Sequence, residues 1–201
     1  MAVYTVAITG ASGAAYGVRL LGCLLEGGHH VHLCVTREGG MVLREETGLS
    51  WSGTPEEMEV SIRKSLRGKG GSLRVFYEDD FLAPIASGSV PVDAMIIVPC
   101  SMKTAAGVAA GSSGNLVERA ADVTLKERRP LIMVPRETPL SAIHLRNLLT
   151  LARMGVHVLP AMPAFYHHPK SVEEMVDFVV GRILDALKLE HRLYRRWTSA
   201  E

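Results

Sequence analysis

The chain has 201 residues, 47% of them hydrophobic, and its 22 Lys and Arg residues against 21 Asp and Glu residues leave a formal net charge of +1. This near-neutral charge argues against a nucleic-acid-binding protein, and the length and even composition favour one domain over residues 1–201. The amino terminus lacks a basic signal segment, the apolar runs are too short to cross a bilayer, and the three cysteines form no CxxC pair. We therefore expect a cytoplasmic protein that has no membrane segment and keeps its thiols reduced.

Short apolar runs alternate with amphipathic patterns along the whole chain. The strand candidates are YTVAIT, VHLCVT, LRVFY, AMIIVP, LIMVP and VHVLP. The helix candidates are residues 14–26, residues 41–47, one segment within 50–71, the region around 105, and residues 115–127, 141–154 and 171–191. This alternation predicts an α/β fold in which helices cover both faces of a parallel sheet. We expect the last helix to pack on the domain or on a neighbouring subunit.

Polar residues and glycines follow several predicted strands at their carboxyl ends. They are residues 10–13, Thr36, residues 100–104 and residues 136–137. Ligands of open α/β sheets bind at this edge, because loops and helix amino termini converge there. The functional site is therefore expected at the carboxyl edge of the sheet.

The turn TGASGAAYG, residues 9–17, has the features of an anion site. Gly10 and Gly13 allow a tight turn, Ser12 offers a hydroxyl, and the following helix directs free N–H groups at the turn. A phosphate site fits these features, and so does a purely structural strand-to-helix turn. The spacing is not GxGxxG, so a nicotinamide cofactor is not supported. A second loop, PCSMKT at residues 99–104, is also suited to phosphate.

A local concentration of cations surrounds the apolar run LIMV in ERAADVTLKERRPLIMVPRETP, residues 118–139. The five cations are Arg119, Lys126, Arg128, Arg129 and Arg136. A helix dipole favours cations in the last turn, which accounts for Arg128 and Arg129. It does not account for Arg136, which follows the strand.

The helix expected over residues 115–127 carries two of these cations. Arg119 and Lys126 lie seven residues apart, about two helical turns, so they can share one face. Asn115 and Glu118 have the spacing of a capping box, which predicts where this helix begins.

Four segments occur in a fixed order along the chain: ITGASGAAYGVRLL, PCSMKT, ERAADVTLKERRPLIMVPRETPL and PAFYHHPKS. They resemble the UbiX-type flavin prenyltransferase family from about Val6 to Trp197. The related cysteine decarboxylases would be expected to show PxMNxxMW, which this chain lacks. The resemblance implies a three-layer Rossmann-like or flavodoxin-like fold, a dodecameric homo-oligomer, and transfer of a dimethylallyl group from dimethylallyl monophosphate to N5 and C6 of reduced FMN. The product, prenylated FMN, would serve a UbiD-type decarboxylase.

The resemblance also implies roles for individual residues. Together with Gly10 of the turn, the expected flavin contacts are Ala11, Ser12, Gly13, Thr36, Ser101, Met102, Lys103, Thr104 and Arg136. The expected contacts of the prenyl phosphate are Arg119, Lys126, Tyr166 and Arg182, with the ring of Trp197 near the cationic carbon. Glu137 and Ser12 are expected to transfer protons, and Lys126 to balance the charge of the leaving phosphate. Phe81 stands near a position where the family often has tryptophan.

The residues also have simpler interpretations. Lys126 fits an ordinary helix-end charge, and Arg182 fits a side chain that lays its stem along an apolar helix face. Glu46 falls where the family has an active-site carboxylate, but its chemistry fits a solvated helix residue, so its role stays open. The adjacent histidines at 167 and 168 lack the spacing of a metal site, and Asp79 and Asp80 do not continue as DDxxD, so we expect no metal. The alternative functions are a flavin-dependent decarboxylase and a non-catalytic flavin carrier.

Overall fold

The computed structural model describes residues 1–66 and 70–197 of the chain. A six-stranded sheet lies at its centre, and neighbouring strands run parallel in the order β3-β2-β1-β4-β5-β6. The strands are β1 (Val3–Ile8), β2 (His30–Val35), β3 (Ser72–Phe76), β4 (Ala94–Cys100), β5 (Leu131–Pro135) and β6 (His157–Val158). The helices are α1 (Ala14–Glu26), α2 (Arg37–Thr47), α3 (Pro55–Leu66), α4 (Met102–Ala110), α5 (Leu116–Lys126), α6 (Ala142–Arg153) and α7 (Val172–Ala186), with a short 3₁₀ helix, η1 (Pro84–Ala86).

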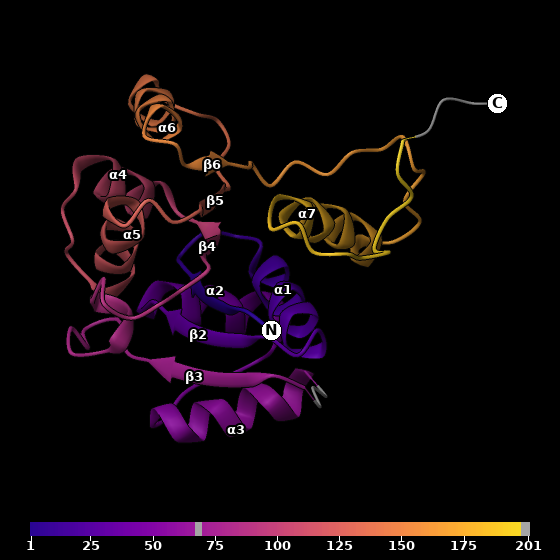
Figure 1. Cartoon of the computed structure of the whole chain (residues 1–201). Coiled ribbons are helices and arrows are strands. Elements are labelled where there is room, and N and C mark those ends of the chain that lie inside the picture. The colour runs from indigo at the N-terminus through magenta and orange to yellow at the C-terminus, as the bar shows by residue number, and fades with distance from the viewer. Residues whose placement is uncertain (67–69, 198–201) are drawn as a thin grey trace.

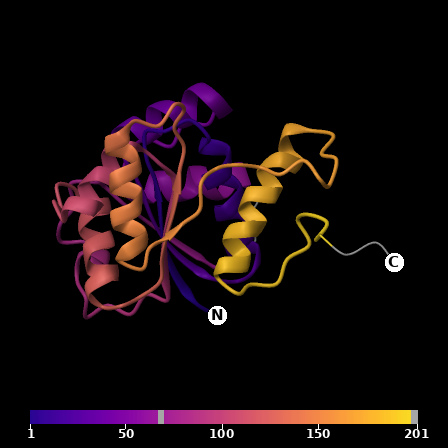
Figure 2. The same cartoon turned by 90° about the horizontal axis from the view of Figure 1, so that it is seen from above.

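Alternate residues of the strands face two separate hydrophobic cores. Ile96 and Ile132 pack with α1, α3 and α7, whereas Ile97 and Met133 pack with α4, α5 and α6. Every residue of β4 and β5 is buried, because helices cover both sides of these strands. Figure 2 shows α4, α5 and α6 on one side of the sheet and α7 on the other. The predicted α/β fold, with a parallel sheet between two helical layers, is confirmed.

The carboxyl-terminal part of the chain extends from the sheet as an arm (Figures 1 and 2). After β6 the chain extends away from the sheet and then forms α7, which packs on the side of α1. The segment after α7 reverses direction and runs along this helix. The Arg19 guanidinium donates to the Asp177 carboxylate at 2.6 Å, which ties α7 to α1. The last helix therefore packs on its own chain.

Three predicted boundaries are wrong. Helix α7 ends at Ala186 rather than at residue 191, and Lys188 beyond it has a φ of 59°, outside the helical region. Helix α2 begins at Arg37 rather than near residue 41, because the Thr36 hydroxyl caps it by accepting from the Gly39 N–H. Strand β6 has only two residues. Across residues 1–66 and 70–197, the helices are too short or too polar to span a membrane.

Candidate functional site

The loops after β1, β4 and β5 are joined at the carboxyl edge of the sheet. The Thr9 hydroxyl donates to the Pro99 carbonyl at 2.9 Å and accepts from the Ser101 N–H at 2.8 Å. The Arg136 N–H donates to the Cys100 carbonyl at 3.3 Å. Strand β1 has β2 on one side and β4 on the other, so the strand order reverses here. Such a reversal creates the crevice in which open α/β sheets bind ligands.

A small cavity of about 90 Å³ lies at the amino termini of α2 and α4. Thr36 caps α2, and Ser101 caps α4 by accepting from the Thr104 N–H at 3.2 Å. Helix amino termini favour anions because their first N–H groups have no partner within the helix. The cavity, which we call the helix-terminus cavity, is therefore suited to a phosphate. It is lined by Gly10, Thr36, Glu38, Ser101, Lys103, Thr104 and Asn115.

A larger cavity of about 620 Å³ shares Glu38, Lys103 and Asn115 with the helix-terminus cavity. The Lys103 ammonium lies 3.7 Å from the Glu38 carboxylate in an exposed ion pair. Phe81 also lines this cavity and is 48% exposed. The aromatic side chain that stands in place of the family's tryptophan thus faces open space.

The N–H groups at the turn of residues 10–13 were predicted to bind a phosphate, but in the structure they donate to a side chain. Gly13 has a φ of 105°, which favours glycine, and precedes α1. Its N–H donates to both Glu46 carboxylate oxygens, at 3.1 and 2.9 Å, and the Ala14 N–H donates to Glu46 Oε2 at 2.9 Å. The N–H groups expected to face a phosphate therefore face a carboxylate of the same chain.

Glu46 is the functional candidate that residue chemistry alone set aside. Partial burial would raise the pKa of its carboxyl, but hydrogen bonds from Ser12, Gly13 and Ala14, with the charge of Arg136, bring this pKa below the ordinary value. The Arg136 Nε donates to the Ser12 carbonyl at 3.3 Å. An ionised carboxylate, a hydroxyl and a guanidinium thus meet at the amino terminus of α1.

Other predicted residues of this edge differ in exposure. Ala11 and Met102 are only 8% and 7% exposed, so their side chains offer little surface for the expected flavin contacts. Glu137 is exposed beside Arg136, and its carboxylate accepts from the Thr138 N–H at 3.0 Å. It is free to face a ligand or another subunit.

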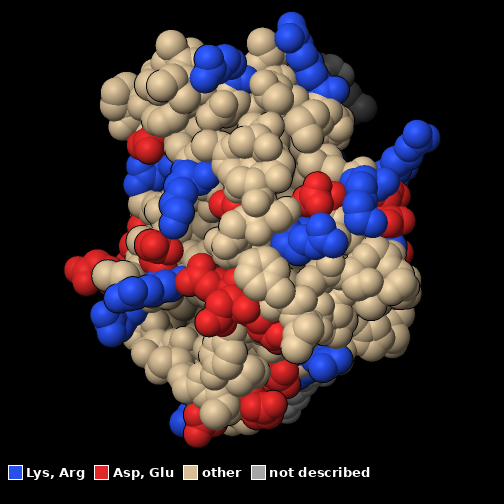
Figure 3. Space-filling view, turned by 90° about the vertical axis from the view of Figure 1, so that its left-hand side faces the viewer, with Lys and Arg blue, Asp and Glu red and all other residues tan. Residues whose placement is uncertain are grey.

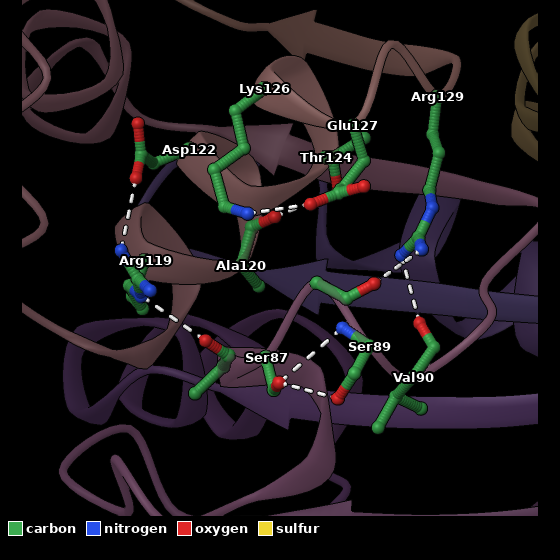
Figure 4. Close-up of polar contacts among 12 residues, drawn as sticks. Ser87, Ser89, Val90, Arg119, Ala120, Asp122, Thr124, Lys126, Glu127 and Arg129 are labelled. Carbon is green, nitrogen blue, oxygen red and sulfur yellow. Dashed lines mark hydrogen bonds and ion pairs between the residues drawn. The ribbon is translucent and has the colours of Figure 1, made fainter.

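Helix α5 carries Arg119 and Lys126 on the side that faces residues 84–90 (Figure 4). Arg119 donates to the Ala86 carbonyl at 3.1 Å and to the Asp122 carboxylate at 3.1 Å. The Lys126 ammonium donates to the Glu127 carboxylate at 2.6 Å. Arg119 and Lys126 therefore lie on the same face of α5, as the spacing predicted.

The predicted capping box of α5 is only half formed. Asn115 accepts from the Glu118 N–H at 2.9 Å, as expected. The Glu118 carboxylate accepts instead from the Gly114 N–H at 2.8 Å and from the Ser112 hydroxyl. Glu118 therefore fixes the loop before the helix rather than the Asn115 backbone.

Tyr166, Arg182 and Trp197 lie in the carboxyl-terminal arm. The rings of Tyr166 and Trp197 meet edge to face with centroids 5.2 Å apart. The Arg182 guanidinium donates to the Asp185 carboxylate at 3.3 Å. Hydrogen bonding to Tyr194 raises the pKa of Arg182, which therefore stays charged.

One chain does not bring the four expected phosphate-binding cations together. Helix α5 has 11 residues and is about 16 Å long. The helix starts at the carboxyl edge of the sheet, where its cap Asn115 lines the helix-terminus cavity. It ends at the amino edge, where Arg129, just beyond the helix, donates to the carbonyls of Gly88 and Val90 in the loop before β4. Lys126 thus lies at the opposite edge of the sheet from Arg136.

The cations of one face of the molecule are dispersed over its surface. On the face viewed in Figure 3, Lys and Arg side chains form separate groups with acidic and uncharged residues between them. Within residues 1–66 and 70–197, no hydrogen bond links Arg136 to Arg182, or either of them to α5. The four cations therefore do not converge within one chain, and their shared role in binding a phosphate stays a prediction.

Comparisons with known proteins connect this site to a family. The Flavoprotein family model matches residues 3–184. The flavin prenyltransferase UbiX of Halalkalibacterium halodurans is 50% identical over 195 residues, which cover 97% of this chain and 93% of that protein. The chain belongs to the UbiX flavin prenyltransferases.

Two solved structures of UbiX-like proteins have the same fold. The dodecameric FMN-dependent Ubix-like decarboxylase of Escherichia coli O157:H7 gives a TM-score of 0.86 at 43% identity, and the alignment covers 98% of this chain and 100% of that one. AnUbiX (PadA1), in complex with FMN and dimethylallyl pyrophosphate, gives a TM-score of 0.86 at 38% identity and covers 100% of this chain and 99% of that one. The resemblance to the UbiX flavin prenyltransferases is thus confirmed over nearly the whole chain.

Proposed function

We propose that this protein is a flavin prenyltransferase that joins the dimethylallyl group of dimethylallyl monophosphate to N5 and C6 of reduced FMN, for use by a UbiD-type decarboxylase. One observation carries the proposal. A phosphate-sized cavity and a separate group formed by Glu46, Ser12 and Arg136 lie at the same edge of the sheet. A reaction between a flavin mononucleotide and a phosphorylated prenyl donor needs one site for the flavin phosphate and a second, separate group of polar side chains where the reaction takes place.

The residues around the helix-terminus cavity fit the phosphate of FMN. Two helix amino termini, the hydroxyls of Ser101 and Thr104 and the ammonium of Lys103 supply the donors and the positive charge that a phosphate needs. Gly10 and Thr36 line the same cavity, and Arg136 reaches the adjoining turn. Reduced FMN supplies the nucleophilic N5 and C6 when it is bound.

Side chains of the protein then accept protons, bind the leaving phosphate and stabilise the cationic carbon. Glu46 is ionised at neutral pH, so it can accept a proton, with the Ser12 hydroxyl as a relay and Glu137 as a second acceptor. Arg119, Lys126, Arg136 and Arg182 hold the departing phosphate by charge-assisted hydrogen bonds. The rings of Tyr166 and Trp197 stabilise the cationic carbon through their faces.

We further propose that the 201 residues act as one domain and that neighbouring copies complete the site. The separation of α5 from Arg136 within one chain supports this assembly, and the E. coli relative is dodecameric. The free thiols of Cys23, Cys34 and Cys100 support a cytoplasmic location.

The similarity to UbiX flavin prenyltransferases does not favour the two alternative functions, a flavin-dependent decarboxylase and a non-catalytic flavin carrier. Neither needs a second phosphate site. The cations beyond the helix-terminus cavity therefore favour prenyl transfer over both alternatives.

Mass spectrometry of the flavin tests the proposal. After incubation of the protein with reduced FMN and dimethylallyl monophosphate, we expect a flavin whose mass has increased by one dimethylallyl unit. Recovery of only unmodified FMN from correctly assembled protein would refute it.

A matched pair of variants controls for general charge effects. Lys126→Ala and Arg128→Ala each remove one exposed cation from the same end of α5. Only Lys126→Ala is expected to lower the yield of prenylated flavin. Equal yields from both variants would remove Lys126 from the site.

A further inference from the structure

The Asp185 carboxylate joins α7 to the segment that follows it. Its oxygens accept from Arg182 Nη1 at 3.3 Å, His191 Nε2 at 3.0 Å, the Tyr194 hydroxyl at 2.5 Å and Arg196 Nη2 at 2.7 Å. The Asp185 side chain is only 18% exposed. We call these five residues the Asp185 cluster.

The Asp185 cluster determines where the end of the arm lies. The Tyr194 ring packs on Phe178 with centroids 4.8 Å apart and covers Gly181, where a Cβ atom would lie 2.5 Å from Tyr194 Cε1. The next residue after Arg196 is Trp197, whose ring contacts Tyr166. The Asp185 carboxylate thus holds Arg182, a proposed ligand of the prenyl phosphate. It also holds the segment that carries the Trp197 ring.

The hydrogen bonds of the Asp185 cluster favour the ionised carboxylate. Partial burial would raise the pKa of Asp185, but the hydrogen bonds from Tyr194, Arg196 and His191 lower it to about 2. The carboxylate is therefore charged throughout the physiological range. The two guanidinium groups of Arg182 and Arg196 and the one carboxylate together carry one net positive charge.

We propose that Asp185 is a positioning residue for the prenyl phosphate, which it serves by orienting Arg182 and by fixing the arm that carries Trp197. The proposal rests on the proposed function, because it takes Arg182 as a phosphate ligand. The Arg182 guanidinium has five N–H donors, of which one binds Asp185 and another interacts with Tyr194, so other donors remain for a phosphate. An isolated surface ion pair would contribute little, whereas a carboxylate with four donors can fix a side chain.

Asp185→Asn distinguishes positioning from simple electrostatics, because the two effects have opposite signs. Removing a negative charge beside Arg182 would strengthen phosphate binding if only net charge mattered. If Asp185 positions Arg182, the dissociation constant for dimethylallyl monophosphate should increase about tenfold, as expected for the loss of hydrogen bonds to a charged group. Calorimetric titration measures this constant without requiring turnover. The affinity for FMN should not change.

Two further variants control for folding and for charge. Tyr194→Phe removes one hydrogen bond from the same carboxylate and should weaken binding in the same direction, by less. Glu190→Gln removes an exposed negative charge nearby and should leave binding unchanged. Trypsin should cleave after Arg192, Arg195 and Arg196 faster in Asp185→Asn than in Glu190→Gln, because the arm is released.

A double-mutant cycle with Arg182→Ala decides whether Asp185 acts through Arg182. We expect Asp185→Asn to have little further effect on binding once Arg182 is absent. Unchanged or tighter binding in Asp185→Asn, or fully multiplicative effects in the cycle, would overturn the proposal. Wild-type protein that binds dimethylallyl monophosphate without modifying FMN would refute the proposed function alone, and the binding comparison would still test Asp185.

Discussion

The carboxylate of Glu46 lies at the amino terminus of α1, where Gly13 and Ala14 donate to it. No local pattern distinguishes this residue from its neighbour Glu45, since both are acidic residues on an amphipathic helix. Its position depends on how closely α2 approaches β1. At Gly39 a Cβ atom would lie 2.4 Å from the Ile8 carbonyl oxygen, so the first turn of α2 packs directly on the strand end. This tertiary contact explains why residue chemistry alone did not identify Glu46.

Replacing Glu46 by Gln should slow prenyl transfer while leaving FMN bound. The change keeps the shape of the side chain but removes its charge and its capacity to accept a proton. We expect a decrease of about 10²-fold or more in the single-turnover rate, the usual contribution of general acid–base catalysis. The control is Glu45→Gln, which removes a charge from the adjacent exposed position. An unaltered rate in Glu46→Gln would exclude Glu46 from the chemistry.

The charges of individual side chains also predict independence from divalent metal. Arg119, Lys126, Arg136 and Arg182 together exceed the charge of a phosphate dianion, so Mg²⁺ would be redundant. Turnover of dimethylallyl monophosphate should therefore persist in EDTA. Product formation is compared with chelator, without it, and after adding Mg²⁺ to the chelated sample. Activity abolished by EDTA and restored by Mg²⁺ would show that the side-chain cations are not sufficient.

At the scale of elements, the sequence predicted the strands better than the helix ends. Strands β4 and β5 are buried on both faces and therefore appear as continuous apolar runs. The end of α7 was not predictable in this way, because apolar residues continue through Leu187 and Leu189 after the helix has stopped. Those residues pack against the core from the returning segment instead. An apolar pattern therefore predicts which residues are buried, but it does not show whether those residues lie in a helix or in the segment that follows it.

The caps of α4 and α6 provide a matched test of the helix-terminus cavity. Ser101 and Ser141 each accept from a backbone N–H at 3.2 Å, but only Ser101 lines the cavity. Replacing either serine by Ala should reduce the free energy of unfolding by about 1 kcal/mol. Only Ser101→Ala should also weaken FMN binding, measured by fluorescence titration. Equal FMN affinity in the two variants would place the flavin phosphate elsewhere.

At the scale of the whole molecule, the expected site residues lie in three places: the carboxyl edge of the sheet, helix α5 and the carboxyl-terminal arm. The family resemblance implied a set of site residues, but spacing along a chain does not show how these residues meet between copies of it. Arg119 and Lys126 share a helix face, as predicted, yet that face contacts residues 84–90 of its own chain. We therefore propose that neighbouring subunits supply the cations that one chain does not bring together.

Mixing two variants of lowered activity tests this proposal most directly. Lys126→Ala and Arg182→Ala subunits are purified separately, allowed to exchange, and assayed for prenylated FMN by mass spectrometry, with exchange verified by distinguishable tags. If a site takes Lys126 and Arg182 from different subunits, some hybrid sites contain both cations, and activity should rise above that of either parent. Under verified exchange, activity that stays at the level of the parents would contradict a site shared between subunits.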